Sequence, residues 1–563
     1  MSPDEPSAHP RSPTVPRTQP TAQNDPPISA GLLGPDRAWH LTAGTVTVVA
    51  AVAFTVWAFS HAGPGVNAPL LLLAILFGLF MAFNIGGNDV ANSFGTSVGA
   101  GTLTMKQALV VAAIFEVSGA VLAGGSVTDT VRSGIVDIDG MQVDPESFAL
   151  IMMSALLGAA LWLLAATRMG WPVSTTHAII GGIVGAAVTT GVVTGTGGLE
   201  MVQWGEIGQI AVSWVLSPAL GCIVSLLLFG AIKRHILAPA SRAIALGSQG
   251  FDDAEDDEED DGEDEEDVEE SRRHVSGHER VGELQQSAFA ESAALDLSPG
   301  SPGADLAERA RTLTKKERKA ARKVERKAAY HALEKRVPVL AAGAAVVIAA
   351  MLLFKGLSNV GLELSIAGTV ILLIMVAISV WMAVTVFARA LKKQSISRAT
   401  FMMFSWLQVF TASAFAFSHG ANDIANAVGP FAAVLDVLAT GEISTEAAVP
   451  AAVLIAFGIA LVSGLWFVGR RVIATVGSGL TSMHPSSGFA AELAAAGVVL
   501  TASVLGLPVS STHILIGAVL GVGIVNRSAN WKLMRPIALA WVITLPAAAG
   551  IGAVGVLVLR AVF

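Results

Sequence analysis

Long apolar segments recur along most of this 563-residue chain, and they leave few folds open to it. Hydrophobic residues make up 53% of the sequence and charged residues only 14%, with most charges gathered in a few stretches. Several uncharged runs reach about 18 residues, the length that a helix needs to cross a bilayer. The runs are continuous, whereas strands of a membrane barrel alternate apolar and polar residues. The sequence therefore predicts an all-α, polytopic membrane protein with about 12 transmembrane segments.

These apolar segments fall into two groups separated by a long polar stretch. We predict about 13 of them, and some are expected to be broken or re-entrant and not full spans. They cover residues 41–60, 68–85, 106–124, 148–167, 172–190 and 206–231 in the first group, and 337–354, 362–388, 401–418, 447–468, 487–506, 508–525 and 537–562 in the second.

The polar parts of the chain are the N-terminal tail and the stretch between the two groups. Residues 1–37 are rich in Pro, Ser, Thr and Gln, so we expect a disordered tail. Residues 232–336 contain 16 acids within the 19 positions Asp252–Glu270, followed by a basic run, Lys315–Lys327. We expect the acidic part to be disordered and the basic part to form a helix at the membrane surface. The whole loop serves either as a solvated linker or in regulation.

A short polar motif with one aspartate occurs twice, each time directly after an apolar run. It occupies Asn84–Ser93 in the first half of the chain and Ser418–Ala427 in the second. A charge inside a membrane segment is costly, so such an aspartate is a candidate functional residue. We therefore expect the membrane helices to fade or break around Asp89 and Asp423, and the two copies to build one site.

A second motif is duplicated as well. Pro-Val-Ser-Thr-Thr-His occupies residues 172–177, and Pro-Val-Ser-Ser-Thr-His occupies residues 508–513. The two prolines are 336 positions apart, and the aspartates of the first motif are 334 positions apart. Two unrelated motifs at nearly the same offset indicate an internal duplication, with membrane repeats at 38–231 and 337–563.

Lysine and arginine indicate the direction of each repeat, because cytoplasmic loops of membrane proteins carry an excess of these residues. The first Asp motif is followed by Lys106, whereas the second is preceded by Arg398 and followed by Asp436. The Pro-Val-Ser motif is preceded by Arg168 in the first repeat and followed by Arg527 in the second. Equivalent segments therefore run in opposite directions, and such inverted-topology repeats place a substrate site near the middle of the membrane.

The Pro-Val-Ser motif indicates a helix that begins inside the membrane, because proline suits the first helical turn and Ser or Thr caps it. The free N–H groups and the positive dipole end of such a helix attract anions, and two of them facing each other suit a tetrahedral oxyanion. Simple capping of a transmembrane helix is the alternative. The candidate anion-binding residues are Ser174, Thr175, Thr176, Ser510, Ser511 and Thr512.

The Asp motif offers carboxylate and carboxamide oxygens, the ligands that hard cations such as Na⁺ prefer. Asn88 and Asn92 are four residues apart and share one face if this segment is helical. Polar packing between helices is the alternative explanation. The candidate cation-binding residues are Asn88, Asp89, Asn92, Asn422, Asp423 and Asn426.

Two further acids, Glu116 and Glu492, lie inside apolar runs, where each can bind a cation, carry a proton or pair with a helix terminus. His177 and His513 follow the hydroxyl clusters, and a structural role is the commoner one for a lone histidine. The chain lacks the glycine-rich phosphate loop of ATP-driven pumps, and its single Cys222 excludes internal disulfides. Nothing in the sequence indicates an enzyme, a resident cofactor or a nucleic-acid partner.

These motifs resemble those of the PiT family of inorganic phosphate transporters, and the resemblance extends over both membrane halves. Gly87–Thr96, Phe115-Glu116 and Leu507–His513 resemble the sodium-coupled branch of the family more than the bacterial proton-coupled branch. Gly87 stands where the family usually has alanine, which is a mild difference. The resemblance does not extend to the N-terminal tail or the acidic tract.

The resemblance implies a secondary transporter that imports inorganic phosphate by cation symport and alternating access, with Na⁺ as the coupling ion. It implies that the Ser and Thr residues named above bind phosphate, that the Asp and Asn residues bind the cation, and that Glu116 and Glu492 are critical for transport. Homodimers are also implied. The charge bias places residues 232–336 in the cytoplasm of a multi-pass plasma-membrane protein.

Three alternative functions fit the same residues. The first is a proton-coupled carrier of a neutral metal–phosphate complex, in which Glu116 and Glu492 carry protons. The second is a transporter of sulfate or another tetrahedral oxyanion. The third is a channel or a membrane receptor without transport.

Overall fold

The computed structural model describes residues 37–124, 127–128, 130–131, 134–137, 143–248, 313–359, 365–443, 449–481 and 483–563. The chain divides into two compact units, Met1–Thr45 and Val46–Phe563, and the second contains every helix after α1. The predicted N-terminal tail, apart from Arg37, and the acidic tract Asp252–Glu270 lie outside the described residues.

The described residues are mostly helical. The first half of the chain forms α1 (Arg37–Ala62), α2 (Ala68–Ile85), the π-helical turn η1 (Gly86–Val90), α3 (Ala91–Gly99), α4 (Met105–Ala123), α7 (Pro145–Arg168), α8 (Thr175–Thr194), the short 3-10 helix η2 (Leu199–Met201) and α9 (Trp204–Ile232), which continues through the π-helical turn η3 (Lys233–Leu237) into α10 (Ala238–Ser248).

The second half forms a corresponding series of helices after a long basic one. It comprises α14 (Lys315–Asn359), α15 (Ile366–Ala390), the 3-10 helix η5 (Leu391–Lys393), α16 (Ile396–Asp423), α17 (Ala425–Thr440), α18 (Ala451–Val468), α19 (Arg470–Ala474), the π-helical turn η6 (Thr475–Gly479), α20 (Pro485–Val504), α21 (Ser511–Val525) and α22 (Trp531–Val562).

Eleven helices among the described residues are long and apolar enough to cross a membrane. α21, with 15 residues, is shorter. Large apolar side chains on the outward faces of α9, α15 and α22 are exposed, among them Val215, Met375 and Val542, as expected of surfaces that face lipid. The structure therefore confirms the predicted all-α polytopic membrane protein.

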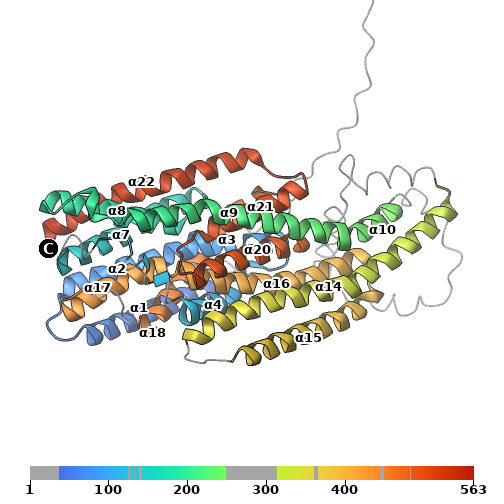
Figure 1. Ribbon diagram of the computed structural model, residues 1–563, viewed down its shortest axis with the longest axis horizontal. Coiled ribbons are helices and arrows are strands. Elements are labelled where there is room, and N and C mark those ends of the chain that lie inside the picture. Colours follow the sequence, from blue (N-terminus) through green and yellow to red (C-terminus); the bar gives the residue numbers. More distant parts are fainter. Residues whose placement is uncertain are drawn as a thin grey trace, which may run out of the picture. The chain divides into compact units, whose positions relative to one another are not determined.

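The two repeats run in opposite directions, as the charge bias predicts. In Figure 1, α2, η1 and α3 run from left to right, whereas α16 and α17 run from right to left. α8 and α21 begin near each other in the middle of the bundle and extend towards opposite ends. Their first turns touch, because the Thr176 hydroxyl donates a hydrogen bond to the backbone oxygen of Val509 at 3.0 Å.

Two non-helical linkers of six residues lie directly before α8 and α21. Residues 169–174 separate α7 from α8, and residues 505–510 separate α20 from α21. At the Asp motifs the α-helices give way, as expected, but without a non-helical linker. Around Asp89 the helix widens into the π-helical turn η1, and after Asp423 only Ile424 separates α16 from α17. A π-helical turn keeps the backbone bonded while it redirects side chains, and such turns are frequent at functional sites.

Glycines bring helices of one repeat against helices of the other. A Cβ atom on Gly420 of α16 would lie 2.1 Å from the backbone oxygen of Glu116 on α4. A Cβ atom on Gly86 would lie 1.7 Å from the backbone oxygen of Leu461 on α18. Only glycine permits such close backbone packing between membrane helices. The contact between α4 and α16 sets Glu116 beside the second Asp motif.

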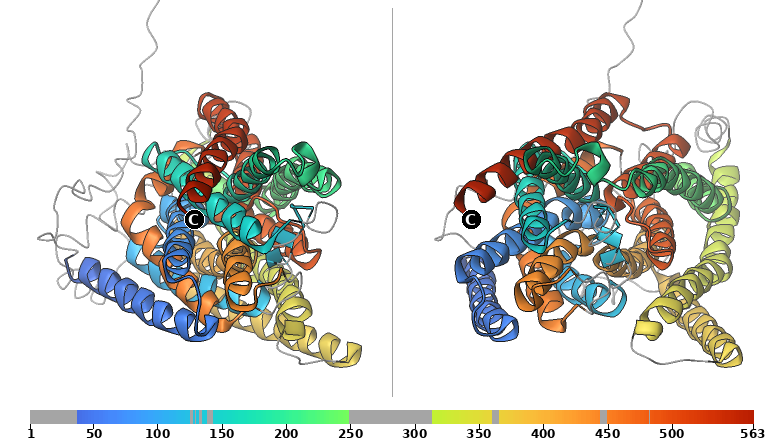
Figure 2. Two further views of the ribbon diagram at one scale, coloured as in Figure 1. Left: turned by 90° about the vertical axis from the view of Figure 1, so that its left-hand side faces the viewer. Right: turned by 60° about the vertical axis from the view of Figure 1, so that its left-hand side comes forward.

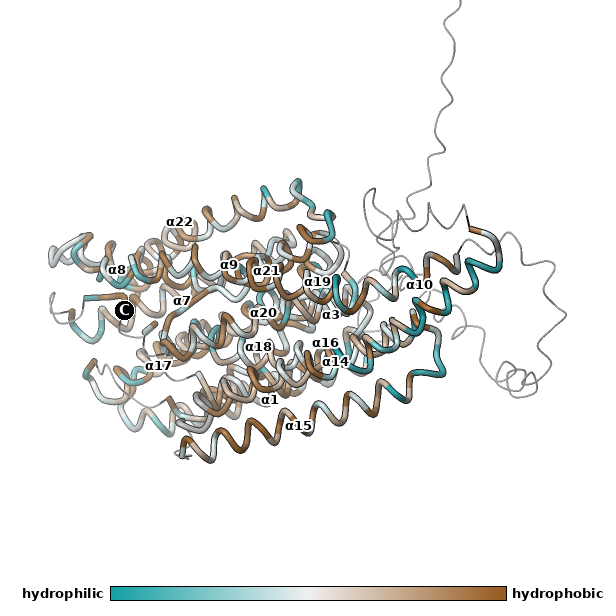
Figure 3. Tube along the Cα trace, turned by 45° about the vertical axis from the view of Figure 1, so that its right-hand side comes forward, coloured by the Kyte–Doolittle hydropathy of each residue, from teal (hydrophilic) through white to brown (hydrophobic). Residues whose placement is uncertain are grey.

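Helices cover both ends of the polar stretch 232–336. α10 follows α9, and the basic run Lys315–Lys327 is helical, as expected, and forms the start of the long helix α14. Figure 2 shows α14 and α15 at one edge of the bundle in both views. In Figure 3 the hydrophilic parts of α10 and α14 lie together at one end of the helices.

Candidate functional site

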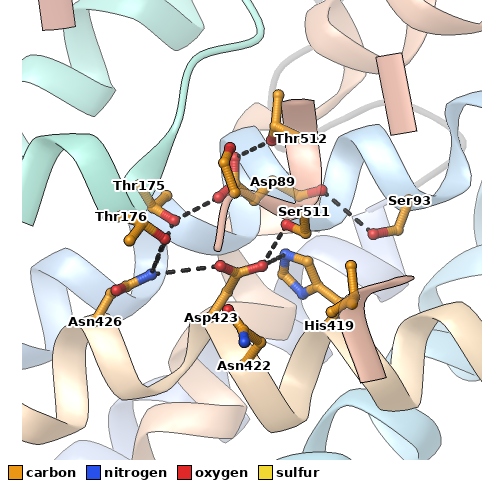
Figure 4. Close-up of polar contacts among 12 residues, drawn as sticks. Asp89, Ser93, Thr175, Thr176, His419, Asn422, Asp423, Asn426, Ser511 and Thr512 are labelled. Carbon is orange, nitrogen blue, oxygen red and sulfur yellow. Dashed lines mark hydrogen bonds and ion pairs between the residues drawn. The ribbon is translucent and has the colours of Figure 1, made fainter. Parts of the chain in front are cut away.

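Two buried aspartates, one from each repeat, meet at the centre of the candidate site. Asp89 comes from η1 and Asp423 from the last turn of α16, with 2% and 0% of their surface exposed. A carboxylate oxygen of each and a ring nitrogen of His419 lie within 4.8 Å of one another. The two copies of the duplicated motif therefore meet in one buried cluster, which makes it the candidate site (Figure 4).

Asp89 accepts hydrogen bonds from the first turns of both α8 and α21, the two helices that begin in the middle of the bundle and that we call the half-helices. The Thr175 hydroxyl, in the first turn of α8, donates to Oδ2 at 2.5 Å, and the Thr512 hydroxyl, in the first turn of α21, donates to Oδ1 at 2.7 Å. Each half-helix thus contributes one hydroxyl to the same carboxylate. Asp89 is the point at which the starts of α8 and α21 are tied together.

Asp423 has a different set of partners. Its Oδ2 atom accepts a hydrogen bond from the Ser511 hydroxyl and lies 3.0 Å from Nε2 of His419. Its Oδ1 atom lies 3.4 Å from the amide nitrogen of Asn426, which donates to it. Two of these three partners, His419 and Asn426, belong to the same helical run as Asp423 itself.

Asn426 links the second Asp motif to the first half-helix. Its amide nitrogen donates to the hydroxyl oxygens of Thr175 and Thr176, both at 3.2 Å. The structure therefore brings together six of the sequence-predicted residues in one buried cluster, whose members are Asp89, Thr175, Asp423, Asn426, Ser511 and Thr512. Thr176 joins them through Asn426 and Val509.

Ser174 and Ser510 cap the half-helices. Their side-chain oxygens accept hydrogen bonds from the backbone N–H of His177 at 3.1 Å and of His513 at 3.3 Å. The two histidine rings pack against each other with centroids 4.6 Å apart, and each also packs against a tryptophan. A structural role therefore accounts for both histidines, as expected for their position.

Asn88 and Asn422 occupy equivalent places in the two repeats. The amide nitrogen of Asn88 donates to the Thr167 hydroxyl and to the backbone oxygen of Trp171, both at 3.0 Å, and its oxygen accepts from the N–H of Val173 at 3.1 Å. Asn88 thus fixes the non-helical linker before α8 at both ends.

Asn422 makes the matching contacts with the linker before α21. Its amide nitrogen donates to the Ser503 hydroxyl at 3.0 Å and to the backbone oxygen of Leu507 at 3.4 Å. The two asparagines therefore position the half-helices through hydrogen bonds to the linkers and to the ends of the preceding helices, α7 and α20. Asn92 lies in α3, and its side chain is outside the described part of the structure.

Glu116 reaches the cluster through a histidine that the sequence analysis did not select. Its Oε2 atom lies 2.8 Å from Nδ1 of His419, and both side chains are almost completely buried. His419 therefore bridges Glu116 and Asp423. The equivalent position in the first repeat holds Ile85. A histidine beside the Gly-x-Asn-Asp pattern shared by the two copies, present in only one of them, was the available signal.

Glu492 forms a separate buried cluster. Its Oε1 atom accepts hydrogen bonds from Thr96 at 2.6 Å and Ser97 at 2.5 Å on α3, and Gln408 on α16 donates to the same atom at 3.1 Å. Its Oε2 atom accepts from Thr411 at 2.8 Å. The carboxylate on α20 thus joins α3 of the first repeat to α16 of the second, and sequence spacing gave no sign of these four donors.

The chemistry of the central cluster favours cations and oxyanions together. If its carboxyl groups are ionised, Asp89, Asp423 and Glu116 outnumber the single imidazole of His419, and an excess of negative charge in a buried site attracts cations. The oxygen atoms of the two aspartates and neighbouring hydroxyls can coordinate a hard cation. The starts of α8 and α21 add N–H groups and dipoles that suit an anion.

Comparison with known proteins agrees with this arrangement. Residues 85–552 match the phosphate transporter family. The chain belongs to this family. The match contains both Asp motifs and both half-helices, so the site lies within the part that defines the phosphate transporter family. The protein is accordingly a transporter and not an enzyme.

Relatives within the phosphate transporter family are similar over nearly their whole length. A protein of Mycobacterium bovis described as a putative phosphate permease is 58% identical over 540 residues, covering 95% of this chain and 96% of the relative. The chloroplastic inorganic phosphate transporter 2-1 of Arabidopsis thaliana is 32% identical over 565 residues, covering 97% and 83%. A solved structure described as the sodium-dependent phosphate transporter has a TM-score of 0.66 at 28% identity and covers 88% of this chain and 100% of its own.

Proposed function

We propose that this protein imports inorganic phosphate by symport with Na⁺, through alternating access of the two repeats. The observation that carries the proposal is the convergence of Asp89 and Asp423 with hydroxyls from the starts of both half-helices in one buried cluster. The family match supports phosphate as the substrate, and the similarity to a sodium-dependent phosphate transporter supports Na⁺ as the coupling ion.

The phosphate would lie between the first turns of α8 and α21. Backbone N–H groups at a helix start have no partner within the helix, and the positive end of the helix dipole attracts the anion. The hydroxyls of Thr175, Thr176, Ser511 and Thr512 are the donors at hand. Two half-helices facing each other can hold a tetrahedral oxyanion from opposite sides.

Coupling to a cation follows from the way these hydroxyls are used. A hydroxyl has one proton to donate, and in this structure Thr175, Thr512 and Ser511 donate theirs to the aspartates. A phosphate that entered alone would meet two carboxylates and no free donor from these three residues. A cation bound to Asp89 and Asp423 neutralises them and frees the hydroxyls for phosphate, so the cation is required for phosphate binding.

Glu116 and Glu492 would couple the loaded site to movement of the repeats. Glu116 extends from α4 to His419 on α16, and Glu492 extends from α20 to Thr96 and Ser97 on α3. Both contacts cross from one repeat to the other, and rocking of the repeats must rearrange them. The contacts of these two acids would therefore depend on the relative position of the two repeats.

The protein is further proposed to be a homodimer in the plasma membrane, with residues 232–336 in the cytoplasm. The basic N-terminal part of α14 supports this orientation, because lysine and arginine accumulate on the cytoplasmic side. Disulfide trapping of paired cysteine substitutions and accessibility labelling of Lys323→Cys in sealed cells test the two statements separately.

The direct test of the proposed function is phosphate uptake into proteoliposomes that contain the purified protein. An inward Na⁺ gradient should drive accumulation of labelled phosphate, and a proton gradient of equal size should not. Unlabelled sulfate in excess should leave the uptake unchanged, because competition by sulfate would indicate a broader oxyanion carrier. No accumulation under either gradient, in protein that elutes as a single folded species, would contradict the assignment of phosphate.

One observation favours a second candidate, the proton-coupled carrier of a metal–phosphate complex. Glu116, His419 and Asp423 form an uninterrupted chain of groups that can bind protons. If this candidate is correct, uptake requires Mg²⁺, follows the proton gradient and ignores Na⁺. The same proteoliposomes distinguish the two coupling ions.

A further inference from the structure

The N-terminal part of α14 carries a stripe of exposed positive charge that the transport cycle does not use. Six basic residues lie on one side of this part, and we call them the basic stripe: Lys316, Lys319, Arg322, Lys323, Arg326 and Lys327. At 3.6 residues per turn they fall within an arc of about 140°. The acids of the same segment, Glu317 and Glu325, fall outside this arc.

One flank of this helix is covered by α10. Ala329 and Leu333 of α14 are buried in the same apolar cluster as Ala243 and Ile244 of α10. The contact also contains an ion pair, in which Nε of Arg242 lies 3.0 Å from Oε2 of Glu325. The basic stripe lies beside this contact, its six residues remain exposed, and no ion pair to them is found among the described residues.

The two helices are antiparallel, which places the end of α10 close to the basic stripe. Arg336 donates a hydrogen bond to the backbone oxygen of His235, and Arg242 pairs with Glu325, so the contacts move towards the start of α14 as α10 proceeds. Continued in the same sense, this pairing brings Ser248, the last residue of α10, beside the first turns of α14. The acidic tract Asp252–Glu270 begins four positions later.

We propose that the basic stripe of α14 is the docking surface for the acidic tract Asp252–Glu270 of the same chain. The tract carries 16 acids in 19 residues, and its opposite charge complements the stripe. The stripe extends about 17 Å along the helix, a length that roughly five or six extended residues span. A third of the tract is therefore enough to cover the stripe, and only a few residues separate the tract from the end of α10.

The membrane surface is a less suitable partner for the stripe. Figure 1 shows that α14 extends farther to the right than the end of α15. The stripe lies about 15 to 32 Å along the helix from Val337, where the apolar part of α14 begins. Attraction to anionic lipids falls off within a Debye length, about 10 Å at moderate salt. The stripe is therefore held away from the headgroups, at the level where the acidic tract starts.

The proposal is tested by measuring the distance between the two segments in the full-length protein. Spin labels are attached at Gly262→Cys in the tract and at Ala320→Cys beside the stripe, after replacement of the single native cysteine, Cys222→Ala. Neither labelled position removes a charge. In bilayers of zwitterionic lipid at low salt we expect a population of short distances, and at about 1 M salt, where the Debye length is about 3 Å, we expect its loss.

A charge-reversal variant and a matched control complete the experiment. Lys319→Glu, Lys323→Glu and Lys327→Glu together should abolish the short-distance population. Lys393→Glu, Lys532→Glu and Arg535→Glu change the net charge by the same amount at exposed positions outside the stripe and should leave it intact. Absence of short distances at low salt, or their persistence after reversal of the stripe, would overturn the proposal. Their loss when anionic lipid is added would assign the stripe to the membrane surface instead.

Discussion

The two Asp motifs descend from one duplicated pattern, yet they use their carboxylates differently. Asp89 is held by Thr175 of its own repeat and by Thr512 of the other. Asp423 takes one hydroxyl, from Ser511, and its remaining partners are His419 and Asn426 on the helical run to which it belongs. The first aspartate therefore depends on the alignment of the two repeats, whereas the second carries most of its partners with it.

This difference separates two tasks within one site. In the proposed transport cycle, a carboxylate whose donors come from both half-helices loses a partner whenever the repeats move apart, so we propose that Asp89 responds to the conformation of the transporter. A carboxylate with partners from its own segment keeps its orientation during the same movement, so we propose that Asp423 serves as a constant cation ligand. His419, which has Ile85 as its counterpart, is the residue that makes the two halves chemically unequal.

The largest effect is expected from removing either negative charge. Asp89→Asn and Asp423→Asn should each lower Na⁺-driven phosphate uptake by about 100-fold or more, because the cation loses a charged ligand in a buried site. The comparison predicts that residual uptake by Asp423→Asn keeps the wild-type ratio of import to export, whereas Asp89→Asn alters it. Normal uptake by both variants, in folded protein, would refute the cation site.

The next largest effect is expected from the hydroxyls that bind Asp89. Thr175→Val and Thr512→Val each remove a hydrogen bond to a charged group and should lower uptake by about 10- to 100-fold. Thr190→Val is the matched control, because Thr190 lies in α8, is buried and has no hydrogen-bond partner for its hydroxyl among the described residues. Equal effects of Thr190→Val and Thr175→Val would show that loss of uptake reflects packing and not the donor.

The third prediction concerns His419, whose counterpart in the first Asp motif is Ile85. His419→Ile gives the second motif the residue of the first and removes the bridge between Glu116 and Asp423. We expect about a 10-fold loss of uptake, expressed mainly in the Na⁺ concentration needed for half-maximal rate, with a smaller change in the KM for phosphate. His419→Gln, which retains a hydrogen-bonding side chain, should recover part of the rate. An unchanged Na⁺ dependence would mean that His419 only fills space.

The smallest effect is expected from the asparagines that fix the linkers. Asn88→Ala removes three hydrogen bonds and Asn422→Ala removes two, so both should lower stability, by about 1 to 3 kcal/mol, with Asn88→Ala the more harmful. The midpoint of thermal unfolding in detergent measures the order. A larger loss of stability for Asn422→Ala than for Asn88→Ala would contradict the prediction that the linker before α8 is held more strongly than the linker before α21.

The spans, the duplication and the inversion could be predicted because they depend on local composition, repeated motifs and the positions of Lys and Arg. The half-helices could be predicted for a similar reason, since proline and serine act on the turn in which they occur. The continuity of the helices around Asp89 and Asp423 could not, because a π-helical turn has no sharp signature in sequence and glycine permits a break as easily as a close contact.

The hydrogen-bond partners of the buried acids also could not be predicted from local sequence patterns. Glu492 is bonded by Thr96, Ser97, Gln408 and Thr411, which come from α3 and α16 and lie up to 396 positions away in sequence. The role of His419 depends on the contact between α4 and α16, which only the folded chain reveals. Spacing shows which residues share one helix face, and says little about which distant helix they meet.

The glycine contacts between the repeats have a mechanical consequence. Where Gly86 meets Leu461 and Gly420 meets Glu116, the glycine backbone lies directly against the backbone of the facing helix, with no side chain of the glycine between them. At such contacts the helices can slide past each other without a change of side-chain rotamer at the glycine. The energy barrier to a small displacement is therefore low. We expect the boundary between the repeats to slip along these smooth contacts, and a single added methyl group there to lock the transporter while leaving its binding residues intact.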